Sequence, residues 1–274
     1  MLRPEDFFDL EDCPFKDLFK DCEYVWDALK NLKSFIKANL RGNVAEIRRE
    51  GSFITKDKIL HNGKVLTEGF EIDYSGKKPE VKKEGMVLEG ASIICAGSSL
   101  MDDNIQIGKN TIVEPGALIK GPTIIGDNTE VRQGAYIRGD VLVGNNCVVG
   151  HTTEIKSSAL LGGSKAGHFA YIGDSILGSV NLGAGTKLAN LKLIDSKVVL
   201  NIDGKKYETG LRKFGAIMGE GVETGCNSVT TPGTILGRGV LIYPNYTARG
   251  FCPAFKINRV KNKSEQVDKK INHD

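Results

Sequence analysis

Aliphatic residues recur at every sixth position through the middle of the chain. From Val113 onward, a small residue or a valine stands two positions before each of them. Residues two apart on a strand face the same side of a sheet. Each group of six residues therefore places one small and one branched side chain inward, which is typical of hexapeptide β-helices. The aliphatic column comprises Ile107, Val113, Ile119, Ile125, Val131, Ile137, Val143, Val149, Ile155 and Leu161.

The same period returns after an interruption at about 191–212. This interruption contains an Asp203-Gly204 step, which predicts a hairpin turn. A β-helix tolerates an insertion because one corner can extrude a loop while the coils on either side stay stacked. We expect the loop to fold over a groove, since long loops in compact folds are usually functional or disordered. The second column comprises Met218, Thr224, Thr230, Leu236 and Ile242.

The two ends of the chain lack the six-residue period. Apolar residues between Val25 and Leu40 follow helical spacing, and the pattern ends before Gly42. Residues 43–80 alternate like short strands. We predict an all-β fold with a small α/β N-terminal segment at 1–85, a parallel β-helix at 86–250, and a polar C-terminal tail at 251–274.

Composition narrows the function classes. The net charge is +3 and the isoelectric point is near 8.4, which is too mild to indicate nucleic-acid binding. The sequence shows neither a signal peptide nor an apolar stretch of membrane-spanning length. The six cysteines form no C-x-x-C pair, so we expect buried free thiols in a reducing compartment. These features predict a cytoplasmic protein without a membrane partner.

Histidine is scarce, and its positions bear on chemistry. Only His61, His151, His168 and His273 occur, and we predict no metal site because a zinc site needs three or four converging ligands. His168 follows Gly167, which would occupy the aliphatic column after Leu161. His168 is either a surface corner residue or a general base, because histidine titrates near neutral pH.

Two segments make a family resemblance specific. "EIKSSALLGGSKAGHFAYIGD" at 154–174 and "VNLGAGT" at 180–186 resemble the acetyltransferase domain of bifunctional N-acetylglucosamine-1-phosphate uridyltransferases. The resemblance covers roughly 90–260. It implies a left-handed β-helix and a homotrimer. It also implies acetyl transfer from acetyl-CoA to the amine of glucosamine-1-phosphate, without a required metal.

The resemblance also implies roles for individual residues. His168 would be the catalytic base, and Asn190 would orient the amine. Arg138 and Lys156 stand eighteen positions apart, so they lie one coil apart on one face. If these cations are structural instead, Asp140 and Glu154 are the expected partners. The resemblance assigns the sugar phosphate to Arg138, Lys156 and Lys213, the sugar to Tyr171 and Asn181, and coenzyme A to Ala184, Cys226 and Arg259.

Departures from the family pattern leave a second hypothesis open. The stretch between His168 and Asn181 is one residue short, and the usual C-N-Y-D-G sequence is replaced after Asn190. The chain could therefore be a non-catalytic sugar-nucleotide-binding or trimerisation β-helix. The phosphate-binding loop of nucleotidyltransferases is missing, so we predict no nucleotidyl transfer. A relationship to UDP-N-acetylglucosamine pyrophosphorylases would then reflect ancestry.

Overall fold

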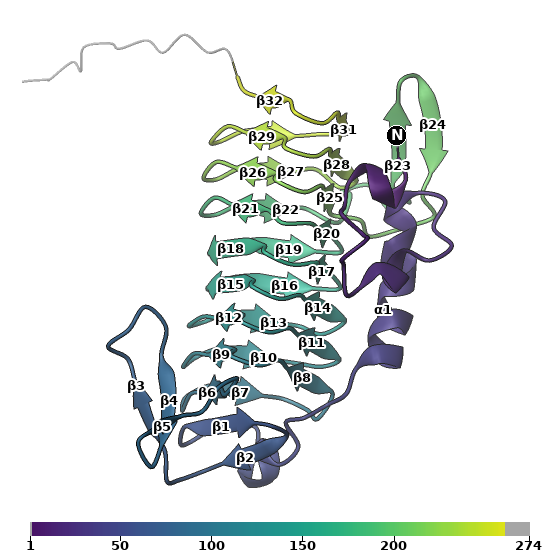
Figure 1. Ribbon diagram of the computed structural model, residues 1–274. Helices are drawn as coiled ribbons and strands as arrows, with labels where there is room; N and C mark the ends of the chain where they lie inside the picture. Colours follow the sequence, from purple (N-terminus) through teal and green to yellow (C-terminus); the bar gives the residue numbers. More distant parts are fainter. Residues whose placement is uncertain (1, 261–274) are drawn as a thin grey trace, which may run out of the picture.

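The computed structural model describes residues 2–260 and is a three-sided parallel β-helix, with the described ends of the chain near one end of the stack (Figure 1). Three sheets form its sides, one with eleven strands and two with eight. Parallel strands pair from coil to coil throughout, as in Glu130–Val131 with Val148–His151. The predicted β-helix of hexapeptide repeats is confirmed.

Each coil contributes one strand to each sheet. The coils continue through β31 and β32, so the predicted boundary at 250 is wrong, because both strands still pair with the preceding coil. Predictions for 261–274 lie outside the described residues.

The first sheet contains β6 (Ser92–Ile94), β9 (Ile112–Val113), β12 (Glu130–Val131), β15 (Val148–His151), β18 (Lys165–His168), β21 (Asn181–Leu182), β26 (Glu223–Thr224), β29 (Leu241–Ile242) and β32 (Ile257–Asn258). The second sheet contains β7 (Ser99–Leu100), β10 (Leu118–Ile119), β13 (Tyr136–Ile137), β16 (Glu154–Lys156), β19 (Tyr171–Gly173), β22 (Lys187–Leu188), β27 (Val229–Thr230) and β30 (Thr247–Ala248). The third sheet contains β8 (Ile105–Ile107), β11 (Thr123–Ile125), β14 (Val141–Val143), β17 (Ala159–Leu160), β20 (Ile176–Leu177), β25 (Ala216–Met218), β28 (Thr234–Leu236) and β31 (Phe251–Cys252).

The aliphatic column forms the interior, with one correction at its end. Val143 pairs with Leu160, so Leu160 and not Leu161 continues the column. The corner after Lys156 is one residue shorter than the corner of the preceding coil, which moves the next inward positions, Ala166 and Ile172, back by one. Ala166 therefore faces the core next to Val149, and the aliphatic position is not lost to Gly167 as expected.

Two threonine hydroxyls of the inward column, those of Thr111 and Thr129, are hydrogen-bonded to the neighbouring coils. The Thr111 hydroxyl donates to the carbonyl of Gly126 at 2.8 Å and accepts the amide of Thr129 at 3.1 Å. Thr129 repeats the pattern with Gly144 and Cys147. Because buried polar atoms without partners are costly, these contacts explain how hydroxyl groups enter the core.

The N-terminal segment covers the outer face of the third sheet, where α1 (Ala28–Asn39) runs along the stack (Figure 1). Trp26 is 2% exposed and packs in a second core with Ile124 and Leu142 of the third sheet. The predicted helix and the core role of Trp26 are confirmed. Short 3-10 turns accompany the helix at Pro4–Asp6, Lys16–Phe19, Val25–Asp27 and Ile47–Glu50.

The inserted segment forms a hairpin of β23 (Val199–Ile202) and β24 (Lys205–Glu208) around the predicted Asp203-Gly204 turn. It packs against the N-terminal segment, because the Tyr207 ring contacts the rings of Tyr24 and Trp26 at 5.6 and 5.9 Å. The expected loop over a groove is therefore instead an extension of the second core.

Five further strands lie at the opposite end of the stack. β1 (Lys58–His61) pairs with β6 and so extends the first sheet beyond the parallel coils. β2 (Lys64–Leu66) completes a hairpin with β1 through an Asn62-Gly63 turn. A separate small sheet of three antiparallel strands projects beside this end (Figure 1). Its strands are β3 (Glu71–Asp73), β4 (Glu80–Lys83) and β5 (Met86–Val87).

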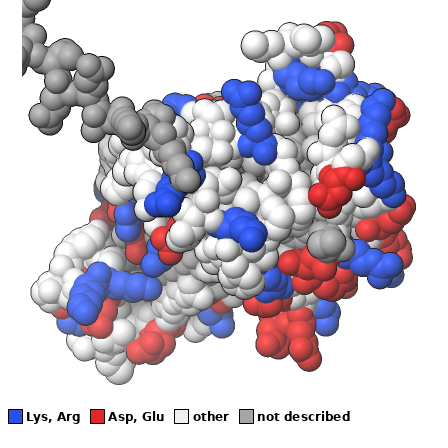
Figure 2. All heavy atoms as spheres, turned by 90° about the horizontal axis from the view of Figure 1, so that it is seen from above, with Lys and Arg blue, Asp and Glu red and all other residues white. Residues whose placement is uncertain are grey.

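The surface charge is mixed. On the end seen in Figure 2, Lys and Arg side chains lie interspersed with Asp and Glu around the rim.

All six cysteines are free thiols, as expected, but only Cys95 and Cys147 are buried, and Cys226 is exposed. Burial raises the pKa of the Cys147 thiol to about 11. Among the described residues, no helix is long and apolar enough to cross a membrane.

Candidate functional site

His168 lies at the corner between the first and second sheets, at the end of β18. His151 occupies the same position on the preceding coil. The backbone of this corner is fixed from coil to coil, because the Phe169 amide donates to the His151 carbonyl at 2.6 Å. The His168 side chain is exposed, and within residues 2–260 its ring makes no hydrogen bond or ion pair. His151 differs because its Nδ1 contacts the carbonyl of Gln133 at 3.2 Å.

Residues that follow the two histidines have an uncommon backbone conformation. Gly134 and Gly185 occupy the left-handed position at this corner on neighbouring coils. Thr152 and Phe169 fill the same position with φ of 50° and 34°. A β-branched or aromatic residue is disfavoured there, and such strain clusters at functional sites. At this corner, among the described residues, a β-branched or aromatic side chain takes this conformation only on the two coils that carry the histidines.

Small residues continue the corner beyond His168. The Gly185 amide donates to the His168 carbonyl, and the Asn227 amide donates to the Ala184 carbonyl. Ala184 and Cys226 thus lie on the next two coils of one column. Arg259 lies further along, since it follows Asn258, whose carbonyl accepts the Tyr243 amide at 2.9 Å. The three residues predicted to contact coenzyme A therefore line one edge of the β-helix together with His168.

Two of the three predicted phosphate cations, Arg138 and Lys156, lie on the second sheet, and both are ion-paired. Arg138 contacts Glu154 at 2.7 Å, which is one of the partners expected for a structural role. This hydrogen bond raises the pKa of Arg138. Lys156 contacts Asp174 at 2.7 Å, and not Asp140 as expected. The reason is that Asp174 lies directly on the next coil, where its amide donates to the Lys156 carbonyl.

Asn190 and Tyr171 join this group. The Asn190 amide nitrogen donates to Asp174, and the Tyr171 hydroxyl donates to the Asn190 amide oxygen at 3.3 Å. Burial raises the pKa of Tyr171, and the nearby carboxylates of Glu154 and Asp174 add to this effect. Asp174 connects three predicted site residues, although the sequence analysis did not single it out. The only signal for it was its place in the "YIGD" end of the family motif.

Of the remaining two predicted residues, Asn181 lies apart from this group and Lys213 lies beside it. Asn181 begins β21 and pairs with Lys165, so it lies on the first sheet. Lys213 lines a small cavity of about 180 Å³ with Lys33 of α1 and Asp174. Strand β19 separates the histidine from the cations, because His168 precedes it and Asp174 follows it. The two groups therefore lie at opposite ends of the strands of one sheet. Six residues separate His168 from Asp174, and a chain of six residues spans at most about 20 Å.

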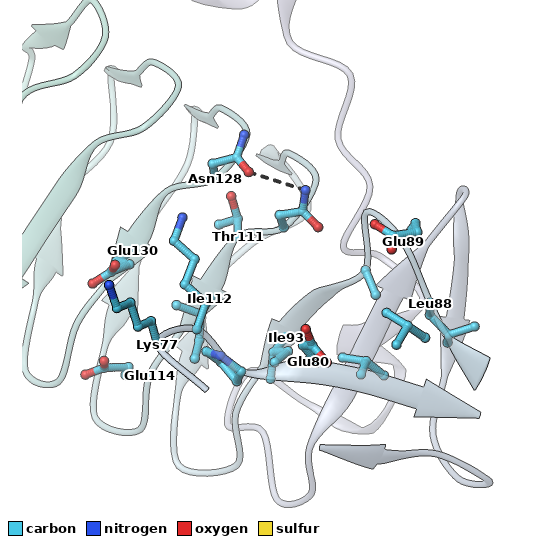
Figure 3. Close-up of a pocket in the computed structure, with 16 residues that line it drawn as sticks. Lys77, Glu80, Leu88, Glu89, Ile93, Thr111, Ile112, Glu114, Asn128 and Glu130 are labelled. Carbon is cyan, nitrogen blue, oxygen red and sulfur yellow. Dashed lines mark hydrogen bonds between the residues drawn. The ribbon is translucent and has the colours of Figure 1, made fainter. Parts of the chain in front are cut away.

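A cavity larger than the one beside Lys213 lies elsewhere. It has a volume of about 400 Å³ and lies between the β3–β5 sheet and the first sheet (Figure 3). Ile93 and Ile112 contribute apolar lining, while Lys77, Glu114 and Glu130 contribute charge. None of the predicted site residues lines it. Among the described residues, no group of three His, Cys, Asp or Glu side chains could hold a metal ion.

Comparisons with known proteins agree with the resemblance. Residues 119–252 match a family described as the GMPPB C-terminal domain. A bifunctional sugar-1-phosphate nucleotidylyltransferase/acetyltransferase from Sulfurisphaera tokodaii is 40% identical over 99 residues, which cover 35% of this chain and 25% of that protein. The bifunctional protein GlmU from Methanococcus maripaludis is 44% identical over 200 residues, which cover 69% of this chain and 47% of that protein.

The chain thus spans less than half the length of these two curated relatives. Among solved structures, AntD, an N-acyltransferase from Bacillus cereus in complex with dTDP and coenzyme A, is 14% identical with a TM-score of 0.22, and the match covers 65% of this chain and 82% of AntD. A score this low supports no argument. The sequence similarities confirm that the β-helical part resembles bifunctional sugar-phosphate nucleotidylyltransferase/acetyltransferase proteins.

Proposed function

We propose that this protein is an acyltransferase that moves the acetyl group of acetyl-CoA to the amine of an amino-sugar phosphate such as glucosamine-1-phosphate. The observation that carries this proposal is the corner column. An exposed histidine, whose ring makes no hydrogen bond or ion pair within the described residues, stands at a strained corner, and the coils beyond it bear the small residues Ala184 and Cys226. A catalytic base needs an open position of this kind.

In this mechanism His168 accepts the proton of the acceptor amine as the nitrogen attacks the thioester carbonyl. The carbon–sulfur bond then breaks, and coenzyme A leaves as its thiol after taking up a proton. Asn190 orients the amine, while Tyr171 and Asn181 contact the sugar. General base catalysis of this type contributes about 10²–10⁴-fold to a rate.

Acetyl-CoA would lie along the corner column. Adjacent coils are about 4.8 Å apart, and small side chains at Ala184 and Cys226 leave the edge open for an extended pantetheine arm. Arg259 would meet a phosphate group of the coenzyme, because a guanidinium presents a bidentate fork to phosphate oxygens. The reaction needs no metal.

Arg138, Lys156 and Lys213 would hold the phosphate of the acceptor. The ion pairs of Arg138 and Lys156 leave room for this role, since a lysine ammonium has three donors and Asp174 uses one. His168 and the cations lie at opposite ends of the strands of the second sheet. We therefore expect a neighbouring copy in a cytoplasmic homotrimer to close the site over this sheet.

The direct test is a thiol-release assay with acetyl-CoA and glucosamine-1-phosphate. Turnover is expected with this pair, and none is expected in a parallel nucleotidyl-transfer assay with UTP and N-acetylglucosamine-1-phosphate. Thermal shifts with coenzyme A and with glucosamine-1-phosphate measure binding independently, because ligands that bind the native state raise the melting temperature. An absence of both turnover and binding would reject the proposal.

The ion pairs favour a second candidate, a non-catalytic β-helix that binds sugar nucleotides or supports trimer formation. Arg138–Glu154 and Lys156–Asp174 already balance both cations. Arg138→Ala separates the two candidates. The enzyme hypothesis expects a strong rise of the acceptor KM with little change in the acetyl-CoA KM. A binding protein would instead show a shift with UDP-N-acetylglucosamine and no turnover for either form.

A further inference from the structure

Asp174 is the common partner of two predicted site residues from different coils. Its Oδ2 accepts Lys156 Nζ at 2.7 Å from the preceding coil. The same oxygen accepts Asn190 Nδ2 at 2.5 Å from the following coil. One carboxylate oxygen therefore spans three coils and brings a cation and an amide together.

The contacts are shielded from water. The side chains of Lys156 and Asp174 are only 15% and 16% exposed, and Asn190 is 8% exposed. Hydrogen bonds in such surroundings are stronger than in water, and unpaired polar groups there are costly. The three groups therefore hold one another in a fixed arrangement.

Asp174 also decides which way the Asn190 amide faces. A carboxylate accepts hydrogen bonds, so it selects the amide nitrogen and repels the amide oxygen. The oxygen is then turned toward the Tyr171 hydroxyl, which donates to it at 3.3 Å. The Asn190 backbone is fixed separately, because its carbonyl accepts the Phe214 amide at 2.9 Å.

Gly173 makes room for this arrangement. A Cβ atom at Gly173 would lie 2.7 Å from the Tyr171 hydroxyl and 2.8 Å from Asn190 Nδ2. Any side chain would displace the tyrosine or the amide. The sequence Tyr171–Asp174 is thus a single unit in which a bare glycine allows the contact and the aspartate orients it.

We propose that Asp174 is a positioning residue for acetyl transfer, acting through Asn190 to present the amide oxygen to the acceptor amine. This inference rests on the proposed function. Asp174 does not itself touch the reacting atoms. It keeps Asn190 in place although the sequence that follows Asn190 departs from the family pattern.

The test is a double-mutant cycle with Asp174→Asn and Asn190→Ala. Asparagine keeps the shape and tolerates the left-handed backbone at this corner, where Asp174 has φ of 47°. If Asp174 acts through Asn190, Asp174→Asn lowers kcat at least tenfold in the native background and less than twofold in the Asn190→Ala background. The acetyl-CoA KM should stay within twofold.

Asp140→Asn is the matched control. Asp140 has the same left-handed conformation, with φ of 51°, and pairs with Lys33. It should leave kcat and acceptor affinity near their native values. An equal loss of kcat in both backgrounds, or no loss in either, would overturn the proposal. So would tighter acceptor binding at native kcat, which would make Asp174 only a counterion of Lys156.

Calorimetry with glucosamine-1-phosphate separates this inference from the proposed function. If the native protein binds this ligand without turnover, acetyl transfer is rejected. If the native protein turns over and the Asp174→Asn variant has the same kcat, only the positioning role is rejected.

Discussion

At the scale of single residues, the corner that carries His151 and His168 differs from the rest of the stack. Two in-register histidines are followed by Thr152 and Phe169 in left-handed conformations that glycine or asparagine adopts on other coils. Folding tolerates such strain only where the surrounding structure holds it in place. The two histidines also differ from each other, because only His151 has a hydrogen-bond partner among the described residues.

Replacing His168 by alanine should lower turnover by about 10²–10⁴-fold, the usual worth of a general base. The melting temperature should hardly change, since the ring is exposed and makes no hydrogen bond within the described chain. Steady-state kinetics and calorimetric melting check the two parts. His151→Ala serves as the control and should retain most activity. An unchanged rate in His168→Ala would remove this residue from the mechanism.

Thr152→Asn should stabilise the fold. The side chain of Thr152 is exposed, while its φ of 50° is unfavourable for a β-branched residue and acceptable for asparagine. Relief of this strain is worth about 1 kcal/mol, which corresponds to a rise in melting temperature of about 2 °C for a chain of this size. Thr186→Asn, at a buried position, should lower it. A lower melting temperature for Thr152→Asn would contradict the strain argument.

At the scale of elements, the N-terminal segment and the inserted hairpin form one outer layer. Both bury apolar side chains against the third sheet, with Trp26 and Leu200 in the same cluster as Ile217. Tyr24 stacks on Trp26 with ring centroids 4.7 Å apart, and Tyr207 meets both rings edge-on. The insertion therefore stabilises the layer that covers the third sheet.

Tyr207→Ala should loosen this layer. Loss of two edge-on aromatic contacts costs about 1–3 kcal/mol, because each such pair is worth up to about 1.5 kcal/mol. Denaturant unfolding measures this loss, and limited proteolysis should reveal faster cleavage near α1. The half-exposed Tyr243, which has no ring contact among the described residues, provides the control as Tyr243→Ala. Equal stability of the two variants would mean that the hairpin does not hold the layer.

At the scale of the whole molecule, one side of the prism is covered, and a second side is covered only at the end where the β3–β5 sheet packs. The third sheet is buried on both faces, by the interior and by the N-terminal layer. The first and second sheets meet at the His168 corner. Any assembly in which copies share a site must therefore use these two sheets.

We expect a homotrimer with threefold symmetry. Light scattering at micromolar concentration should give three times the chain mass of 29.7 kDa. Lys187→Glu places a new charge on the exposed outer face of the second sheet and should weaken the trimer, whereas Lys37→Glu on the outer side of α1 should not. A stable monomer would reject both the trimer and the shared site.

Much of the fold followed from the sequence, because the six-residue period reports directly on which side chains face inward. The core positions from Ile107 to Ile155 and the hairpin at Asp203-Gly204 could be read this way. Leu161 was placed wrongly because a corner one residue shorter moves the register without changing the local composition. The period alone cannot reveal where a corner loses a residue.

The sequence by itself determined the coils, the resemblance and the residues that form the candidate site. Only the tertiary structure decided how those residues are grouped. It aligned His168 with Ala184 and Cys226 on one edge, and it paired Lys156 with Asp174 and not with Asp140. The physical reason is that coil-to-coil register depends on the summed length of three corners. A contact between residues on different coils is therefore settled only when the whole coil has closed.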